Sequence, residues 1–430
     1  MRVFIITFGS RGDVQPYIAL GSGLRAAGHH VTIGGHPRFA TFIESYGFEF
    51  ADLGGDPQAS LASIDGKEWM ESGQNPLKFV QGFRKLIALD LHQLTERAWK
   101  AAQNSEVIIG SGTSLYSAAA VSEALSVPFI QAYLQPIHPT WEFPSAVLPL
   151  SIKGGGIINF LTHIIGGQMF WQTLHPLVNQ MRRELFDLPP ISPLLGPLPG
   201  MHRKKMLVLY GYSPSVLPRP KNWEEWIKVT GYWFLDEPNW TPPPELIAFL
   251  DAGPPPVCIG FGSISDNAPE RMTESVLSAL RKTGQRGILL SGWGGLVQSD
   301  LPDEVFLLNE APHSWLYNRS SAVVHHGGAG TTSAAFRSGV PSVIVPFFGD
   351  QLFWADRAYH LGVATKPVPR QFVSASTLAD AIKIAVADST IRERAKELGK
   401  AVSAERGTEV ATDLLDQYLG VGGIYSLQKS

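Results

Sequence analysis

The chain has 430 residues, which exceeds the usual size of one hydrophobic core and predicts two domains. Hydrophobic residues make up 44% of it, and its formal net charge of -3 excludes the basic surface typical of nucleic-acid binding. Cys258 is the single cysteine, which rules out an intrachain disulfide and a cysteine-based metal cluster and favours a cytoplasmic setting.

The first 35 residues predict a strand, a turn, a helix and a second strand. The run "VFIITF" at 3–8 is apolar, helical spacing begins at Pro16, and residues 30–33 are apolar again. In such a unit the first turn often holds a phosphate, but here it contains Asp13, whose carboxylate repels an anion. From this pattern alone, Asp13 is a cap of the following helix or part of an exposed turn, unless the turn has a function other than binding an anion.

Strands and helices continue to alternate up to about residue 136, which predicts a parallel sheet covered by helices. The expected elements are a helix at 76–102, a strand at 107–112, a helix at 118–125 and a strand at 128–136. Residues 136–200 are rich in Pro, Gly and aromatics and are expected to form a largely irregular, substrate-shaping insertion. Within it, the uncharged stretch 154–171 is either a core helix or a contact for a greasy ligand or a membrane surface.

A second series of strands and helices follows a Pro-rich linker at 236–256. It opens with "PVCIGFGS", which echoes "FIITFGS" near the N-terminus. The sequence thus predicts two Rossmann-like α/β domains, at 1–235 and 257–405. The last helical segments, 377–387 and 391–419, either cap the second domain or cross back to the first.

The stretch "HHGGAGTT" predicts an anion site in the second domain, because a strand, a glycine-rich turn and a helix follow one another there. Gly328 and Gly330 let the backbone approach a diphosphate, Thr331 adds a hydroxyl, and His326 adds a ring N–H that can become cationic. His325 points the other way along the strand and is expected in the core. Since no Asp-x-Asp pair and no Walker loop occur, no metal is expected at this site.

Three motifs, "FGSRGDVQP", "HHGGAGTT" and "VIVPFFGDQLFWADRA", resemble those of the inverting family 1 glycosyltransferases. They are most similar to the sterol 3-beta-glucosyltransferase branch and to the related antibiotic glycosyltransferases of actinomycetes. The resemblance covers roughly 1–60 and 257–370. It implies the GT-B fold, in which two Rossmann-like domains face each other across a cleft, with the acceptor on the first domain and the nucleotide sugar on the second. It also implies that a C-terminal helix within 406–430 packs on the first domain.

The same resemblance implies roles for individual residues. Asp13 would accept the proton of the acceptor hydroxyl, and Ser10 and Gly12 would belong to its loop. Asp350 and Gln351 would bind the sugar hydroxyls, although Asp350 could instead only cap the helix after it. The residues implied at the donor diphosphate are Ser263, His326, Gly328, Gly330 and Thr331.

Two positions depart from the pattern of the plant enzymes. Glu310 stands where they have a tryptophan that stacks on the uracil, and Ala334 where they have a glutamate on the ribose. Trp293, which could equally serve in packing, and the backbone near His313 are the candidates for binding the base.

We therefore expect a metal-independent, UDP-dependent hexosyltransferase that moves glucose or a related hexose, with inversion, to an apolar acceptor such as a sterol or another lipid. The alternative is transfer from a UDP- or TDP-sugar to an antibiotic, a polyketide or another small aglycone; an epimerase and a non-catalytic binding protein are further candidates. The nucleotide sugar is a co-substrate, and no cofactor is expected. The expected state is a cytoplasmic monomer or weak dimer, with peripheral membrane contact left open.

Overall fold

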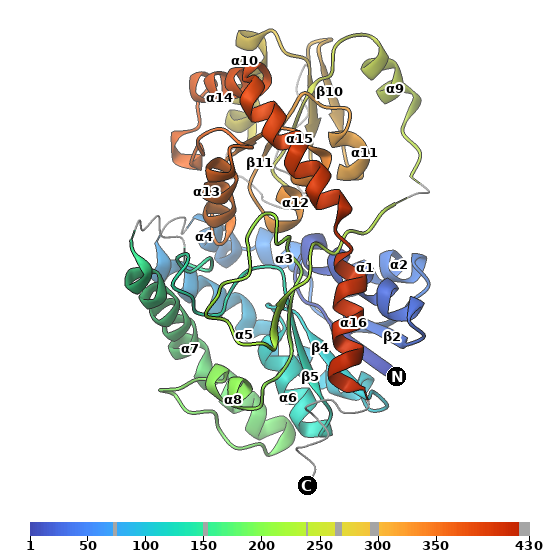
Figure 1. Cartoon of the computed structure of the whole chain (residues 1–430), viewed down its shortest axis with the longest axis vertical. Helices are drawn as coiled ribbons and strands as arrows, with labels where there is room; N and C mark the ends of the chain where they lie inside the picture. Colours follow the sequence, from blue (N-terminus) through green and yellow to red (C-terminus); the bar gives the residue numbers. More distant parts are fainter. Residues whose placement is uncertain (72–74, 149–153, 238–239, 263–268, 293–300, 421–430) are drawn as a thin grey trace. The chain divides into compact units, whose positions relative to one another are not determined.

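A computed structural model of the chain describes residues 1–71, 75–148, 154–237, 240–262, 269–292 and 301–420. These residues fall into two compact units, each built on a parallel sheet with helices packed on it (Figure 1). The first unit contains 1–148, 154–235 and 405–420, and the described residues of 236–404 form the second. The predicted α/β class is confirmed.

The sheet of the first unit has seven parallel strands in the spatial order β3-β2-β1-β4-β5-β6-β7. The chain moves outward from β1 to β3 and then returns to the other side of β1. The strands are β1 (Arg2–Ile6), β2 (His30–Gly35), β3 (Glu49–Asp52), β4 (Val107–Gly110), β5 (Phe129–Tyr133), β6 (Val208–Tyr210) and β7 (Ile227–Val229).

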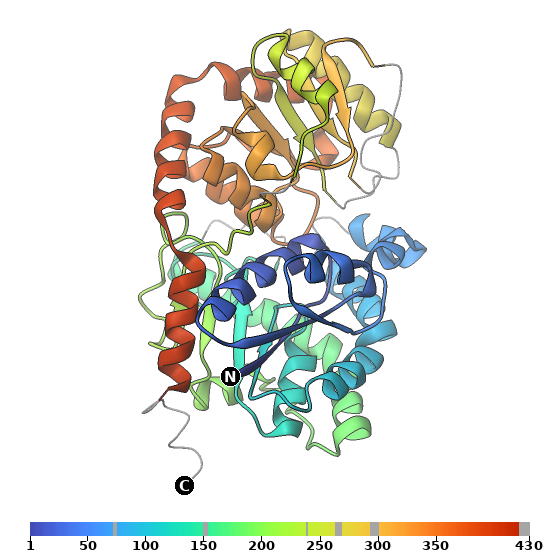
Figure 2. The same ribbon diagram turned by 90° about the vertical axis from the view of Figure 1, so that its right-hand side faces the viewer.

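Helices cover this sheet, so its central strands are apolar along nearly their whole length. Every residue of β4 and β5 is buried. The helices are α1 (Arg11–Ala26), α2 (Ala40–Ser45), α3 (Pro57–Ala62), α4 (Ile64–Glu71), α5 (Pro76–Ala101), α6 (Leu115–Leu125), α7 (Gly156–Phe186), α8 (Leu198–Arg203) and α16 (Gly407–Leu419), with a short 3₁₀ helix η1 (Pro37–Phe39). Helices α5, α6 and α7 pack on one another, and α16 packs on α1 (Figure 2).

The second unit has five parallel strands in the order β10-β9-β8-β11-β12. They are β8 (Val257–Gly260), β9 (Gly287–Leu290), β10 (Val305–Leu308), β11 (Ala322–His325) and β12 (Ser342–Ile344). The helices are α9 (Pro244–Asp251), α10 (Pro269–Thr283), α11 (His313–Tyr317), α12 (Ala329–Ser338), α13 (Gln351–Leu361), α14 (Ala375–Ala387) and α15 (Ser389–Ala404), with a 3₁₀ helix η2 (Arg370–Phe372). Cys258 is buried in its core beside Leu246 and Val323.

The first helix begins at Arg11 rather than at Pro16. Ser10 and Asp13 form a capping box that starts the helix early. Pro16 then lies inside the helix, where its fixed φ is compatible with helical backbone although it cannot donate a hydrogen bond.

Three later segments also differ from expectation. Helix α7 fills much of 136–200, where Gly166, Gly167 and Pro176 conceal its helical spacing. The segment 236–256 holds α9, whose Leu246 enters the second core. The last helical stretch is two helices, and α16 begins at Gly407, where a Cβ would be 2.4 Å from the carbonyl oxygen of Tyr232.

Candidate functional site

Each sheet has one point at which its strand order reverses, and open α/β sheets bind ligands beyond the carboxyl ends of the strands at that point. In the first sheet this point lies between β1 and β4, and in the second between β8 and β11. The loop with Asp13 follows β1, and the loop with His326 follows β11. Each predicted motif therefore lies at the switch point of its own sheet.

Asp13 is held at the start of α1 by Ser10. Oδ2 of Asp13 accepts hydrogen bonds from the backbone N–H and from the hydroxyl of Ser10, both at 2.9 Å. Gly9 lies against the same oxygen, since a Cβ at Gly9 would be 2.5 Å from it. No described residue hydrogen-bonds to Oδ1, so one carboxylate oxygen is left to accept a proton.

The surroundings of Asp13 favour the protonated form of its carboxyl. Burial raises the pKa of its carboxyl above the ordinary value, and the two hydrogen bonds from Ser10 offset this only in part. A higher pKa makes the carboxylate a better proton acceptor. Asp13 is the third residue of α1, and Ser10 occupies the N-cap position. At Gly12, in the same turn, a Cβ would be 3.6 Å from the hydroxyl oxygen of Ser10.

The second loop presents a helix N-terminus. Gly328 is the N-cap of α12, and the backbone N–H groups of Ala329, Gly330 and Thr331 have no acceptor among the described residues. Such a helix start combines open donors with the positive end of the helix dipole, an arrangement that binds phosphate.

The ring of His326 lies between Gly328 of this loop and Gly262, which follows β8. A Cβ at Gly328 would be 2.4 Å from Nε2, and a Cβ at Gly262 would be 2.9 Å from Cε1. Nε2 thus lies beside the N-cap of α12. Burial, with a smaller contribution from His313, lowers the pKa of His326 to about 4. The ring expected to become cationic is therefore neutral at pH 7 without ligand, and it can act as a neutral N–H donor.

His325 shapes the same turn from the core. It is fully buried, its Nδ1 accepts the backbone N–H of Gly327 at 3.1 Å, and burial holds its pKa well below the usual value. Gly327 has a φ of +88°, and a Cβ there would be 3.1 Å from the carbonyl oxygen of Gln351. The glycine-rich loop and the start of α13 are therefore in contact.

Asp350 and Gln351 follow β12, the neighbour of β11. Asp350 is the N-cap of α13, but its side chain makes no capping bond, and its Oδ2 accepts the indole N–H of Trp354 at 3.1 Å. Oε1 of Gln351 accepts the backbone N–H groups of Phe347 at 2.8 Å and Phe348 at 3.3 Å. The side-chain carbonyl of Gln351 is thus occupied. Its side-chain NH₂ is the group that could make the predicted contact with a sugar hydroxyl.

The residues expected at the nucleotide base are only partly described. Trp293, expected at the base, and Ser263, expected at the donor diphosphate, lie outside the described residues. His313 begins α11, and its ring stacks on Tyr317 with centroids 4.8 Å apart. Ala334 packs against the second core, so it offers no polar group for a ribose. Binding of the base by Trp293 and His313 stays a prediction.

Sequence reasoning missed the residues that anchor the Asp13 loop. The N–H of Gly9 donates to Nε2 of His36 at 3.2 Å, and the hydroxyl of Thr113 donates to the carbonyl of Phe8. His36 and Thr113 follow β2 and β4, the two strands that flank β1. Polar side chains directly after neighbouring parallel strands were the signal that could have identified them.

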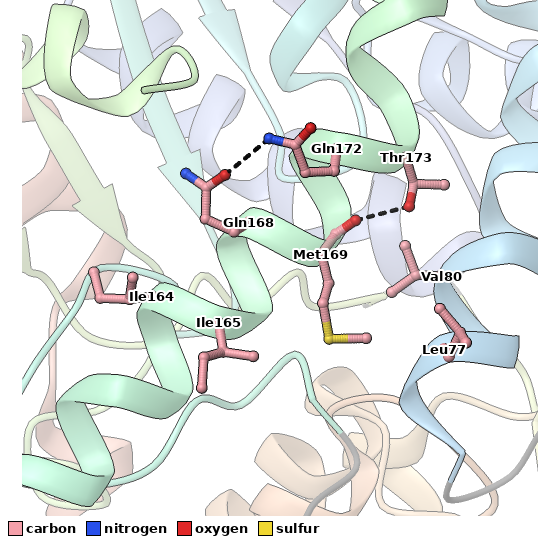
Figure 3. A pocket seen from close by; sticks show the side chains of 8 residues that line it. All are labelled: Leu77, Val80, Ile164, Ile165, Gln168, Met169, Gln172 and Thr173. Atoms are coloured by element: carbon pink, nitrogen blue, oxygen red, sulfur yellow. Dashed lines mark hydrogen bonds between the residues drawn. The ribbon is translucent and has the colours of Figure 1, made fainter. Parts of the chain in front are cut away.

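The first unit has an apolar pocket of about 440 Å³ between α5 and α7 (Figure 3). The apolar part of its lining consists of Leu77, Val80, Ile164, Ile165 and Met169. The polar part consists of Gln168, Gln172 and Thr173. The amide groups of Gln168 and Gln172 donate to backbone carbonyls at Leu194 and Pro193. Their hydrogen bonds are thus partly made within the unit, and the pocket is mainly a site for apolar groups.

An exposed apolar face continues from this pocket toward the start of α7. It comprises Ile157, Ile158, Leu161, Ile164 and Ile165, which are between 43 and 71% exposed. Contiguous apolar surface of this kind usually marks a binding site. The prediction that 154–171 is a core helix explains the buried side of α7 but not this exposed apolar side.

No helix among the described residues combines the length and the apolar character needed to cross a bilayer. No three His, Cys, Asp or Glu side chains gather there in a group that could hold a metal ion.

Comparison with known proteins bears on both units. Residues 3–143 match the model of the glycosyltransferase family 28 N-terminal domain, and residues 294–417 match the erythromycin biosynthesis protein CIII-like C-terminal domain. Among solved structures, the glycotransferase of kitacinnamycin superposes with a TM-score of 0.70 at 18% identity, covering 97% of this chain and 99% of that one. The calicheamicin glycosyltransferase CalG4 gives a TM-score of 0.67 at 18% identity, covering 98% of each chain.

Similarity in sequence extends along the whole chain. The sterol 3-beta-glucosyltransferase of Komagataella phaffii is 35% identical over 97% of this chain, and that of Candida albicans is 36% identical over 94%. This chain spans only 34% and 27% of the lengths of those two proteins. The two family models, the fungal relatives and the shared fold agree with the resemblance seen in the sequence. The chain has the GT-B fold of these glycosyltransferases and is similar along its whole length to the sterol 3-beta-glucosyltransferases.

Proposed function

We propose that this chain transfers a hexose, with inversion, from a nucleoside diphosphate sugar to the hydroxyl of an apolar acceptor of the sterol class. One observation carries the proposal. Among the described residues, the switch point of one sheet has a half-buried carboxylate, that of Asp13, and the switch point of the other has a helix start with open N–H donors. These are complementary parts of one displacement reaction.

In the proposed step the acceptor oxygen forms a bond to the anomeric carbon while the bond from that carbon to the diphosphate oxygen breaks. The hydroxyl proton passes to Asp13, which contributes a factor of roughly 10²–10⁴ as a general base. The negative charge that develops on the diphosphate is met by the N–H groups at the start of α12 and by His326. Asp350 and the amide NH₂ of Gln351 would hold the sugar hydroxyls.

The acceptor class is supported by the first unit and by the relatives. The pocket between α5 and α7 is apolar, and the exposed face of α7 beside it bears no charge, which suits a lipid acceptor and peripheral contact with a membrane surface. The fungal relatives are named sterol 3-beta-glucosyltransferases. For the donor, a Streptomyces glycosyltransferase of the same fold, with a TM-score of 0.64, was solved with thymidine diphosphate. We propose UDP-glucose as donor, following the sterol branch.

Asp13→Asn tests this proposal, because the amide keeps the shape of the side chain and can still accept from Ser10. With UDP-glucose and cholesterol, the rate of transfer should fall roughly 10²–10⁴-fold, while Kd for UDP-glucose stays within a few-fold of wild type. Asp388→Asn is the control, since the carboxylate of Asp388 accepts two backbone N–H groups at the start of α15, outside both loops. Near-wild-type transfer by Asp13→Asn, or an α-glucoside product, would refute the mechanism.

A further inference from the structure

We propose that His36 is a positioning residue for the reaction, holding the loop of Asp13 through the backbone of Gly9, and that only its neutral form with the proton on Nδ1 does so. This inference rests on the proposed function, because it concerns the loop of the proposed base. His36 follows β2 directly, at the same edge of the sheet as that loop.

The two partners of His36 define its tautomer. Nδ1 is 2.7 Å from the carbonyl oxygen of Gly54, which can only accept, so the proton is on Nδ1. Nε2 is 3.2 Å from the backbone nitrogen of Gly9, which can only donate, so Nε2 offers its lone pair. The ring also packs against Phe8, with centroids 4.4 Å apart. One buried imidazole therefore ties β1's loop to the segment that follows β3.

The Gly9 contact is one residue away from Ser10, whose N–H and hydroxyl hold the proposed base. Gly9 has a φ of +129°, a conformation that side-chain-bearing residues rarely adopt, and the next residue, Ser10, donates twice to Oδ2 of Asp13. The hydroxyl of Thr113 holds the carbonyl of Phe8 from the other side. Loss of the His36 acceptor would leave the N–H of Gly9 without a partner and free the backbone that aims Ser10 at Asp13.

Carboxylates near His36 partly offset the effect of burial on its pKa. Burial is the largest influence and lowers its pKa, while the Gly54 carbonyl, Asp90 of α5 and Asp56 at the start of α3 raise it. The neighbouring cations are paired, Arg97 with Asp52 at 3.1 Å and Arg38 with Asp56 at 3.3 Å. The ring is therefore neutral at neutral pH. As the pH falls through its lowered pKa, a proton on Nε2 would oppose the N–H of Gly9 and release the loop.

Two substitutions separate the two hydrogen bonds. His36→Asn can still donate to Gly54 but cannot reach Gly9, whereas His36→Gln can accept from Gly9 and does not titrate. With UDP-glucose and cholesterol we expect His36→Asn to lower kcat about 10–100-fold, with Kd for UDP-glucose within twofold of wild type. His36→Gln should recover most of kcat at pH 8. Thr95→Val removes a buried 2.8 Å hydrogen bond to Ser117 elsewhere in the unit and serves as the stability control.

The pH profile gives a readout that a merely structural role would not change. In the wild type Asp13 must be a carboxylate and the His36 ring must be neutral, so the acid limb of log kcat/KM should approach a slope of two, and in His36→Gln a slope of one. Wild-type kcat in His36→Asn, an equal loss in both variants, or an unchanged slope would overturn the proposal. Full activity in Asp13→Asn would instead remove the proposed function itself, so the two failures are distinguishable.

Should the variants not fold, the wild-type protein still provides a test. Nitrogen-15 NMR of the imidazoles reports which ring nitrogen of His36 carries the proton. A proton on Nδ1 with a bare Nε2 is expected, and a proton on Nε2 at neutral pH would overturn the proposal.

Discussion

Gly328→Ala should weaken donor binding by displacing the imidazole ring of His326. Gly328 has φ −60° and ψ 146°, values that alanine adopts without strain. The added Cβ would be 2.4 Å from Nε2 of His326, about 1 Å closer than an ordinary contact. Because the ring also lies against Gly262, it has little room to move, and the substitution acts mainly on His326.

The size of the effect follows from what His326 contributes. Its pKa of about 4 makes it a neutral donor, and a neutral hydrogen bond contributes about 0.5–1.5 kcal/mol. Displacement of the ring should therefore raise Kd for UDP about 2–10-fold. Alanine is also a poorer N-cap than glycine, which should lower the free energy of unfolding by up to about 1 kcal/mol.

A double-mutant cycle with His326→Ala isolates this effect. Titration calorimetry of UDP, in EDTA, would give Kd for the wild type, both single variants and the double variant. If the alanine acts through the ring, Gly328→Ala should have almost no effect on Kd once His326 is alanine. An equal loss of affinity in both backgrounds would refute the argument and assign the effect to the helix start.

Three further results are expected. Asp350→Ala should reduce sugar transfer while Kd for free UDP, measured by calorimetry, stays nearly unchanged; an equal loss of UDP affinity would assign the residue to the nucleotide or to the fold. UDP should raise Tm equally in EDTA and in Mg²⁺, because backbone N–H groups and His326 meet the diphosphate, and a shift seen only with Mg²⁺ would contradict this. Burial lowers the pKa of His163 to about 4, so the folded state binds fewer protons than the unfolded state below pH 6.5. The free energy of unfolding, from urea titrations, should therefore fall by at most about 3 kcal/mol between pH 6.5 and 4 on account of this group, and by less in His163→Gln; identical pH dependence in the two proteins would exclude His163 as a source.

Local patterns in the sequence predicted the fold well where apolar runs were short and bounded by glycine. The runs that became β1, β8 and β11 were located in this way, and the α/β class followed from their alternation with helices. Only 154–171 was considered as a helix, and the full length of α7 was not predicted, because two glycines and a proline interrupt its pattern and its stability comes from packing against α5 and α6. Tertiary packing of that kind has no local signal.

The candidate site also has features that the sequence predicted and features that depend on the fold. Asp13, His326 and Asp350 could be proposed because each lies in the segment between a predicted strand and the body of the helix after it, and the carboxyl ends of parallel strands share one edge. The neutrality of His326 and the occupied carbonyl of Gln351 could not be predicted, because both depend on neighbours brought in by folding.

The order of the segments has a consequence for protein engineering. The first unit resumes after the second, because α16 packs on α1 and buries Ala411, Leu415 and Tyr418. The second unit is therefore an insertion with two junctions, near residues 235 and 405, and not a detachable C-terminal half. A fragment ending at residue 235 would expose the surface that α16 covers and should aggregate. Chimeras meant to exchange donor preference with a relative should replace residues 236–404 and keep the native α16.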